Sequence, residues 1–199
     1  MTNQWDLRYS GEDFYYGKVP NVFFADFLST LKVKGKLLLP AEGEGRNAVY
    51  AAKLGWKATA FDSSKIAREK ALKFAEEESV SIDYKQLDIT DFFADEAIYD
   101  LIALVFVHLP EPLRQSFHRE LIKSLKPGGM IFMASFAKEQ INNHSGGPSD
   151  LRLLYSLDLL KDDFSGLRQK KLCHEQTMLN EGRHHGVAEV LIYVGEKPA

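Results

Sequence analysis

The sequence predicts an α/β fold built around a doubly wound, largely parallel sheet, and three observations carry this prediction. Short apolar runs alternate with amphipathic stretches from about residue 20 to residue 136, which is typical of βαβ units. A glycine turn, Gly43-Glu44-Gly45, directly follows the first apolar run, where such sheets bind ligands. The last two strand-like runs are joined by Asn180-Glu181-Gly182, a connection short enough for an antiparallel hairpin.

The composition favours one soluble domain, spanning residues 1–199, that handles a small molecule. Of the 199 residues 45% are apolar, enough for one sizeable core. The net charge is −3 and the charges are interleaved, so we expect no nucleic-acid or membrane partner, and either a monomer or a homodimer. Cys173 is the only cysteine, and no apolar leader or membrane-length run is present. We therefore expect a cytoplasmic protein without disulfides.

The individual elements follow from apolar periodicity, capping residues and glycine or proline breaks. Helices are expected to start at Pro20 and to cover residues 47–54, 64–77 and 112–125, with Ser64 as a cap. Five strands are expected at residues 36–40, 57–61, 81–87, 100–107 and 130–136. After a polar loop over 141–150, Asp150 is expected to cap a helix through Leu160, followed by strands at 168–179 and 184–196.

Three segments are predicted to meet where the strands end and to form a nucleotide site. Gly43 and Gly45 allow a ligand to approach the start of the following helix. Asp62, 17 residues after Gly45, is placed to accept hydrogen bonds from ribose hydroxyls. Asp88 is a candidate for holding an adenine amino group. The alternative for Asp62 is a helix cap, and for Asp88 a turn acid.

Several motifs together resemble class I methyltransferases of the tellurite-resistance type. They are Trp5-Asp6-x-Arg8-Tyr9, Tyr16-Gly17, Gly43-Glu44-Gly45-Arg46-Asn47, Asp62, His108-Leu109-Pro110 and Lys126-Pro127-Gly128-Gly129. The resemblance spans nearly the whole chain. It implies a Rossmann-like methyltransferase fold with seven strands in the order 3-2-1-4-5-7-6, the last one antiparallel. It also implies S-adenosylmethionine as cofactor, bound by Tyr9, Ala41, Glu42, Gly43, Gly45, Arg46, Asn47, Asp62, Ser63, Asp88, Ile89 and Val105.

The cofactor loop departs from the family pattern. Leu39 stands where an acid is usual, Ala41 where a glycine is usual, and Glu42 replaces a small residue. We hypothesise that Glu42 or Glu44 pairs with the ammonium group of the methionine moiety in place of the missing acid. The alternative is that both are solvated loop acids.

The candidate catalytic residues are Tyr16, His108, Arg183 and His184, with Tyr9, Arg152 and His185 as further residues near the acceptor. The resemblance implies that a histidine and an arginine in the last segment contact the acceptor. His184 and His185 would face opposite sides of a strand, so no metal site is expected. Trp5, Phe14 and the tyrosines resemble a cover that excludes water from the cofactor, and the alternative is a hydrophobic N-terminal staple.

The sequence therefore predicts S-adenosylmethionine-dependent methyl transfer to a small, anionic acceptor. The resemblance favours a sulfur, selenium or tellurium species such as tellurite. Two alternatives stay open. Gly43-x-Gly45-x-x-Ala48 also fits a dinucleotide fingerprint and hence an NAD(P)-dependent oxidoreductase. A non-catalytic module that binds the cofactor would keep the same fold.

Overall fold

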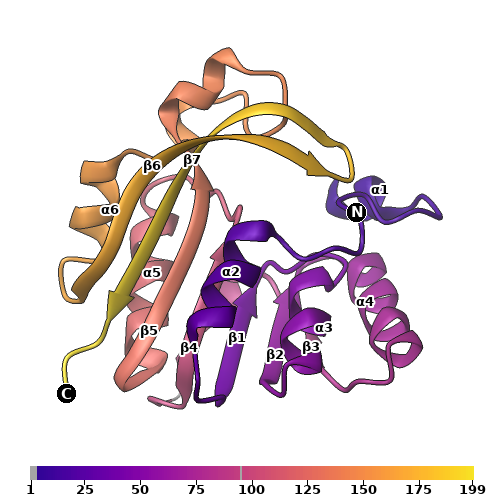
Figure 1. Ribbon diagram of the computed structural model, residues 1–199, viewed down its shortest axis with the longest axis horizontal. Helices are drawn as coiled ribbons and strands as arrows, with labels where there is room; N and C mark the ends of the chain where they lie inside the picture. The colour runs from indigo at the N-terminus through magenta and orange to yellow at the C-terminus, as the bar shows by residue number, and fades with distance from the viewer. Residues whose placement is uncertain (1–3, 95) are drawn as a thin grey trace.

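The computed structural model describes residues 4–94 and 96–199. Its centre is a seven-stranded sheet in the order β3-β2-β1-β4-β5-β7-β6 (Figure 1). The first five strands are parallel to one another, whereas β7 is antiparallel to both of its neighbours. The fold class, the strand order and the antiparallel last strand predicted from the sequence are confirmed. The strands are β1 (Lys36–Pro40), β2 (Lys57–Asp62), β3 (Asp83–Gln86), β4 (Tyr99–Val105), β5 (Leu125–Phe136), β6 (Arg168–Glu181) and β7 (His184–Glu196).

Helices cover both faces of the sheet, and the alternation of side chains along each strand supplies both cores. Leu37 and Leu39 of β1 pack on one face together with α2, α3 and α4. Leu38 packs on the opposite face, where α5 and α6 lie. The helices are α1 (Gln4–Tyr9), α2 (Val22–Thr30), α3 (Arg46–Lys53), α4 (Lys65–Glu77), α5 (Leu113–Ser124) and α6 (Leu157–Asp163), with short 3₁₀ turns η1 (Ile89–Asp91), η2 (Lys138–Asn142) and η3 (Leu151–Leu153).

Capping side chains set where the helices begin. Ser64 accepts a hydrogen bond from Ala67 N at 3.1 Å and caps α4, as predicted. The first sheet-covering helix is capped by Asn21, whose side chain accepts from Phe24 N at 3.2 Å, so it starts at Val22 rather than at Pro20. Gly45 precedes α3 and offers no capping side chain. The backbone amides at the start of α3 therefore need another acceptor.

Three other expectations need correction. Asp150 caps only the short turn η3, through Arg152 N, and Ser156 caps α6 instead. The third strand is confined to Asp83–Gln86, shorter than the run 81–87. The fifth strand, expected at 130–136, begins at Leu125, and the segment 126–129 lies within it as an irregularity where the register with β4 shifts.

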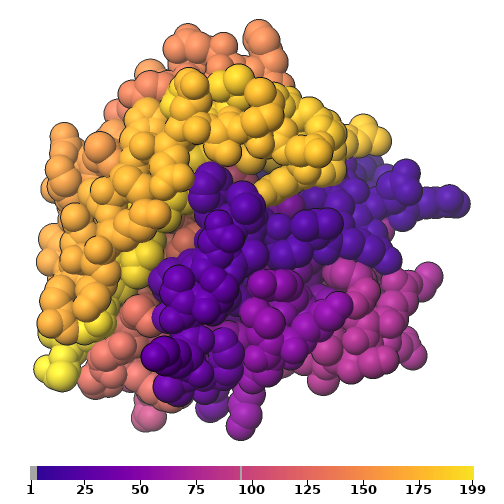
Figure 2. Space-filling view, viewed as in Figure 1, coloured from indigo at the N-terminus to yellow at the C-terminus, as the bar shows by residue number. Residues whose placement is uncertain are grey.

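The N-terminal segment and the tip of the β6–β7 hairpin meet above the carboxyl ends of the strands (Figure 1). The β6–β7 hairpin arches over the sheet, and its tip approaches α1 (Figure 1). Figure 2 shows the indigo N-terminal residues in contact with the yellow hairpin. Gly182 packs so closely at this junction that a Cβ atom there would lie 2.4 Å from Tyr15 O. No described helix is long and apolar enough to cross a membrane.

Candidate functional site

The loop after β1 has the unusual backbone geometry that a close ligand approach requires. Ala41, Gly43 and Gly45 have positive φ angles of 49°, 64° and 86°. A Cβ on Gly43 would lie 2.8 Å from the hydroxyl oxygen of Tyr9, and one on Gly45 would lie 2.6 Å from the Cβ of Ala71. Both glycines are therefore needed for packing as well as for their backbone angles.

Ala41 adopts a left-handed conformation that is strained for any residue with a Cβ. We expect Ala41→Gly to raise the free energy of unfolding by about 1 kcal/mol, because relief of this strain exceeds the added freedom of glycine in the unfolded chain. Urea denaturation measures the change. Ala48→Gly, inside α3, is the matched control and should lower stability instead. A decrease in both variants would contradict the strain at Ala41.

Asp62 joins the cofactor loop to the start of α4. Its Oδ2 accepts a hydrogen bond from Gly43 N at 3.0 Å, and its Oδ1 accepts one from Ser64 N at 2.8 Å. Burial raises the pKa of this carboxyl, although the two backbone hydrogen bonds oppose the shift. Each oxygen keeps a second acceptor site, so the carboxylate can hold the loop and still accept hydrogen bonds from a ligand's hydroxyls.

The residues expected around the adenine lie along the same edge of the sheet. Asp88 is exposed, and its Oδ1 accepts from both the backbone and the hydroxyl of Thr90. It thus makes the turn contact that was its alternative role, while no hydrogen bond to its Oδ2 is present among the described residues. Ser63, Ile89 and Val105 follow or end neighbouring strands and are all partly exposed.

Glu42 supplies the acceptor that Gly45 lacks. Its Oε1 accepts from the backbone amides of Asn47 and Ala48 at 2.7 and 2.8 Å, and its Oε2 accepts from Asn47 Nδ2 at 3.2 Å. Burial raises the pKa of Glu42 to about 7, against the effect of these hydrogen bonds. Glu42 therefore caps α3 through its side chain, a role that the sequence-based hypothesis did not include.

Glu44 faces the N-terminal segment. Its Oε2 accepts from Tyr15 N at 2.7 Å, and its Oε1 pairs with Lys70 Nζ at 2.6 Å. Lys70 also donates to the carbonyl oxygens of Tyr9, Gly11 and Asp13. Both oxygens of Glu44 are thus used to fasten the first residues of the chain over the loop. Lys70 was missed because nothing in a surface helix distinguishes one lysine from its neighbours.

Arg46 and Asn47 connect the cofactor loop to the hairpin tip. Arg46 Nη2 forms an ion pair with Glu181 at 2.7 Å, and both side chains are at most 10% exposed. Arg46 Nη1 donates to Tyr16 O at 3.1 Å. Asn47 Oδ1 accepts from the backbone of Asn21, whose side chain donates to Glu181. This buried network fixes the start of α3 to two distant parts of the chain, Asn21 and Glu181, that the sequence did not single out.

The aromatic residues of the N-terminal segment pack against one another and against α4, and part of this segment is helical. Trp5 and Tyr9 stack with ring centroids 6.0 Å apart. Asp6 accepts from the Ser64 hydroxyl at 2.6 Å, which attaches α1 to the cap of α4. Arg8 donates to the Tyr16 hydroxyl at 3.1 Å. Phe14 packs against α4, edge-on to Phe74 at 5.4 Å.

His184 is the first residue of β7, at the tip of the hairpin, and it lies among aromatic rings. Its ring centroid is 4.8 Å from that of Tyr16, 5.8 Å from that of Phe136 and 6.2 Å from that of Phe106. Burial, followed by the positive charges of Arg46 and Arg8, lowers the pKa of His184 to about 4. Its Nδ1 is buried and has no hydrogen-bond partner among the described residues. His184 is therefore neutral at pH 7 and has a free polar atom.

Phe106 and Phe136 pack beside His184, and the sequence analysis did not identify either of them. We call the rings of Tyr16, Phe106, Phe136 and His184 the aromatic wall. Phe106 follows β4 with a φ of +54°, a rare conformation for an aromatic residue. Its ring stacks on Phe136 at 4.4 Å. Gly146 and Gly147 close over this wall, since Cβ atoms there would contact the rings of His184 and Phe136. The run Val105-Phe106-Val107 looks like an ordinary buried strand, so its sequence carried no signal of this role.

The other acceptor candidates are arranged differently. His108 uses both ring nitrogens on the backbone, with Nδ1 2.8 Å from Leu153 O and Nε2 3.4 Å from Phe136 N. Burial lowers its pKa to about 4. Arg183 lies over the Tyr15 ring at 5.1 Å, and His185 is exposed. Arg152 forms an exposed ion pair with Asp150. Among the described residues none of these four side chains forms a hydrogen bond, ion pair or ring contact with His184, although His184 contributes to the lowered pKa of His108 and His185 to that of His184.

The chemistry of the loop fits an adenosyl amino acid. Asp62 offers carboxylate oxygens for a ribose and a negative charge for a cationic ligand, whereas the amides of Asn47 and Ala48 at the start of α3 are already bonded to Glu42. The described residues contain no group of three or more His, Cys, Asp or Glu side chains that could hold a metal ion.

Comparison with known proteins identifies the chemistry of this fold. Residues 40–129 match the family model of the methyltransferase domain. The chain is 26% identical to the thiopurine S-methyltransferase of Legionella pneumophila over 166 residues, covering 68% of this chain and 73% of that protein. The matched domain contains the whole cofactor loop and Asp62.

Solved structures share the fold at low sequence identity. A structure described as the conversion of a disulfide bond into a thioacetal group during echinomycin biosynthesis has a TM-score of 0.83 and 16% identity, covering 100% of this chain and 92% of that one. TehB from Haemophilus influenzae has a TM-score of 0.73 and 17% identity, covering 89% and 62%. The N-methyltransferase NodS from Bradyrhizobium japonicum, in complex with S-adenosylhomocysteine, has a TM-score of 0.72 and 16% identity, covering 98% and 97%.

With the matched domain, the sheet order and these relatives, the protein is an S-adenosylmethionine-dependent methyltransferase. This finding favours the cofactor predicted from the sequence over the nicotinamide alternative. The predicted class of enzyme is confirmed. The predicted tellurite-resistance type is not, because TehB is only one of several structural neighbours.

Proposed function

We propose that this S-adenosylmethionine-dependent methyltransferase acts on a small, soft anion, and that the acceptor is a thiolate or a related selenium or tellurium species. The observation that carries the proposal is His184, a neutral ring with an unpaired Nδ1 in a wall of aromatic side chains. Burial is the main cause of its low pKa, and the nearby positive charges of Arg46 and Arg8 lower it further. These charges would also stabilise an anionic acceptor.

The relatives support a sulfur acceptor over the alternatives. The Legionella proteins are named for S-methylation of thiopurines, and the echinomycin structure concerns chemistry at sulfur. The heavier chalcogens are favoured only by the resemblance of the sequence motifs to the tellurite-resistance type. Thiolates and their heavier analogues are polarisable, and aromatic rings are a favourable environment for such atoms.

The chain's own residues would mainly align the reactants. When bound, the cofactor supplies a methyl group activated by a positively charged sulfur. An electron pair of the acceptor forms the new bond to carbon, and the old carbon–sulfur bond breaks with its electrons remaining on the cofactor's sulfur. Since the acceptor is already an anion, no proton has to be removed in this step. Alignment of the two partners can contribute on the order of 7 to 11 kcal/mol.

His184 would position the acceptor. In the tautomer that carries its proton on Nδ1, the ring donates a hydrogen bond to the anion. Phe106 and Phe136 would exclude water on one side, and Tyr16 would do so from the cover.

A panel of acceptors tests the proposal. Purified protein is given S-adenosylmethionine with a thiophenol, sodium selenite, tellurite, an aniline or a phenol, and S-adenosylhomocysteine formation is measured. We expect turnover with the thiol or with at least one of the heavier species, and none with the amine or the phenol. Turnover with the aniline alone would overturn the assignment to a soft anion.

A pair of neighbouring histidines isolates the positioning role. His184→Gln is expected to lower kcat at least about tenfold with unchanged cofactor affinity, since one hydrogen bond to a charged group is worth about 1.5 to 3 kcal/mol. His185→Gln, at the exposed neighbour, should have no effect. Because the pKa of His184 is about 4, its neutral form persists above that pH. The ratio of the two rates should therefore stay constant between about pH 6 and about pH 8. A ratio that changes in this range would contradict the role of a neutral His184.

A further inference from the structure

A second cavity lies at the opposite end of the sheet from the cofactor loop. It has a volume of about 670 Å³, within the usual range of small-ligand sites. It is lined by the segment between α2 and β1, by the first residues of β1 and β2, and by residues of β4 and β5. These are the amino ends of the strands, whereas the cofactor loop follows the carboxyl end of β1.

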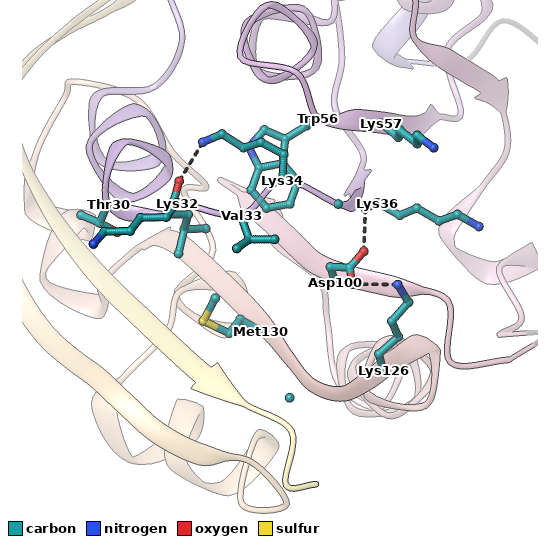
Figure 3. A pocket seen from close by; sticks show the side chains of 13 residues that line it. Thr30, Lys32, Val33, Lys34, Lys36, Trp56, Lys57, Asp100, Lys126 and Met130 are labelled. Atoms are coloured by element: carbon teal, nitrogen blue, oxygen red, sulfur yellow. Dashed lines mark hydrogen bonds and ion pairs between the residues drawn. The ribbon is translucent and has the colours of Figure 1, made fainter.

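The cavity is strongly cationic although the protein is acidic overall. Five lysines and one aspartate line it, which leaves a formal charge of +4 in a chain whose net charge is −3. The single carboxylate, that of Asp100, is already used, because Oδ1 pairs with Lys126 Nζ and Oδ2 accepts from Lys36 N, both at 2.7 Å. The carboxylate therefore lies between Lys36 and Lys126 in Figure 3.

Several of the ammonium groups are available to a ligand. Lys34 donates to Leu31 O at 2.8 Å and lies beside the ring of Trp56. For Lys32, Lys36 and Lys57 no ion pair or hydrogen bond of the ammonium group is found within residues 4–94 and 96–199. A concave surface with one sign of charge concentrates ions of the opposite sign. The cavity is thus suited to an anion that can contact more than one lysine.

The rest of the lining is apolar and contains an unsatisfied donor. Val33 and Met130 contribute apolar surface, and Val33 is 83% exposed. Trp56 is only 5% exposed, and its indole Nε1 has no hydrogen-bond partner among the described residues. Buried indole N–H groups are usually paired. A ligand with a planar, partly apolar portion would match this part of the cavity.

We propose that this cavity is a second ligand site, separate from the methyl-transfer site, for a nucleoside polyphosphate. The phosphates would contact Lys36 and Lys57, which extend to the same side of the cavity in Figure 3, and the planar base would lie against Val33, Met130 and Trp56. Lysine binds phosphate as a point charge without strict geometry, which suits a rim of flexible side chains. The site does not depend on which acceptor is methylated at the other end of the sheet.

Fluorescence of Trp56 provides a local readout. The chain has two tryptophans, so a Trp5→Phe protein reports on Trp56 alone. It is titrated with ATP, pyrophosphate and adenosine in the presence of saturating S-adenosylhomocysteine, which occupies the cofactor site. We expect ATP to change the fluorescence at the lowest concentration, pyrophosphate to bind more weakly and adenosine most weakly. No response to ATP up to millimolar concentrations would overturn the proposal.

Charge variants locate the site. Lys36→Gln/Lys57→Gln should weaken ATP binding about tenfold to a hundredfold, at about one decade per lost contact. The control Lys65→Gln/Lys161→Gln removes the same charge from exposed positions on α4 and α6. Because interactions between exposed charges are weak, it should change ATP affinity less than about twofold. Equal weakening in both proteins would show a general charge effect and overturn the assignment.

Two more measurements separate this proposal from others. Calorimetry with S-adenosylhomocysteine should give the same affinity in both double variants, so a failure of the cofactor assignment appears there and not in the ATP titration. Co-sedimentation with vesicles of phosphatidylserine and phosphatidylcholine tests a lipid surface as the occupant. Binding to the vesicles without binding of ATP would overturn the small-ligand proposal.

Discussion

Asp62→Ala is expected to weaken S-adenosylmethionine binding about tenfold to a hundredfold, which corresponds to about 1.4 to 2.7 kcal/mol. The alanine removes the acceptors of Gly43 N and Ser64 N, so the cofactor loop loses its connection to the start of α4. It also removes the proposed partner of the ribose hydroxyls. Two effects therefore act in the same direction, one on the shape of the loop and one on contact with the ligand.

Calorimetry with S-adenosylhomocysteine measures the loss, and two variants separate its causes. Asp62→Asn keeps one carbonyl acceptor, so it should fall between the wild type and alanine. Asp88→Ala changes an exposed acid whose Oδ1 only closes a turn, and it should cost much less affinity than Asp62→Ala. Full retention of affinity in Asp62→Ala, or a larger loss in Asp88→Ala, would contradict the assigned pocket.

Breaking the ion pair between Arg46 and Glu181 is expected to have the largest effect on stability. Glu181→Ala leaves the guanidinium of Arg46 without its partner at a site where both side chains are at most 10% exposed. Removing one partner of a buried pair typically costs about 3 to 5 kcal/mol of unfolding free energy. The side chain of Asn21 also loses an acceptor, Glu181 Oε1. We therefore expect the free energy of unfolding, measured by urea denaturation, to fall by at least about 3 kcal/mol.

The pair Lys18–Glu77 provides a matched control. Its N–O distance is also 2.7 Å, but each side chain is 45% exposed, and exposed pairs contribute little. Glu77→Ala should therefore leave the denaturation midpoint nearly unchanged. A similar shift of the denaturation midpoint in both variants would contradict the claim that burial makes the Arg46–Glu181 pair important for stability. Glu181→Ala should also weaken cofactor binding, because Arg46 then no longer ties α3 to the hairpin.

The sequence predicted the parts of the fold that local patterns determine. The strands from Lys36 and Lys57 and the cap at Ser64 follow from apolar alternation and from the chemistry of one side chain, and all three are confirmed. The helix expected to start after Asp150 starts at Leu157 instead, because Asp150 and Ser156 are both competent caps and only Ser156 caps α6. Local chemistry alone does not decide between them.

The candidate site was less predictable, because its contacts join residues far apart in the chain. Glu42 was recognised as unusual, but its role as the cap of α3 depends on how the loop folds back. A signal was available, since Gly45 leaves the first amides of that helix without a side-chain acceptor. Lys70 and Glu181 gave no such signal. Their partners lie 26 and 135 residues away, and only the tertiary fold brings them together.

The position of the matched domain has a consequence for how this enzyme can diversify. Residues 40–129 contain the cofactor loop and Asp62, whereas Tyr16, Phe136 and His184 lie outside that range. The aromatic wall is thus assembled largely from segments on either side of the shared domain. On the proposed assignment of the acceptor site, we expect mutations of Tyr16, Phe136 or His184 to alter acceptor preference without changing any residue of the matched domain. Exchange of these three positions between relatives would then show whether acceptor preference can be separated from cofactor binding.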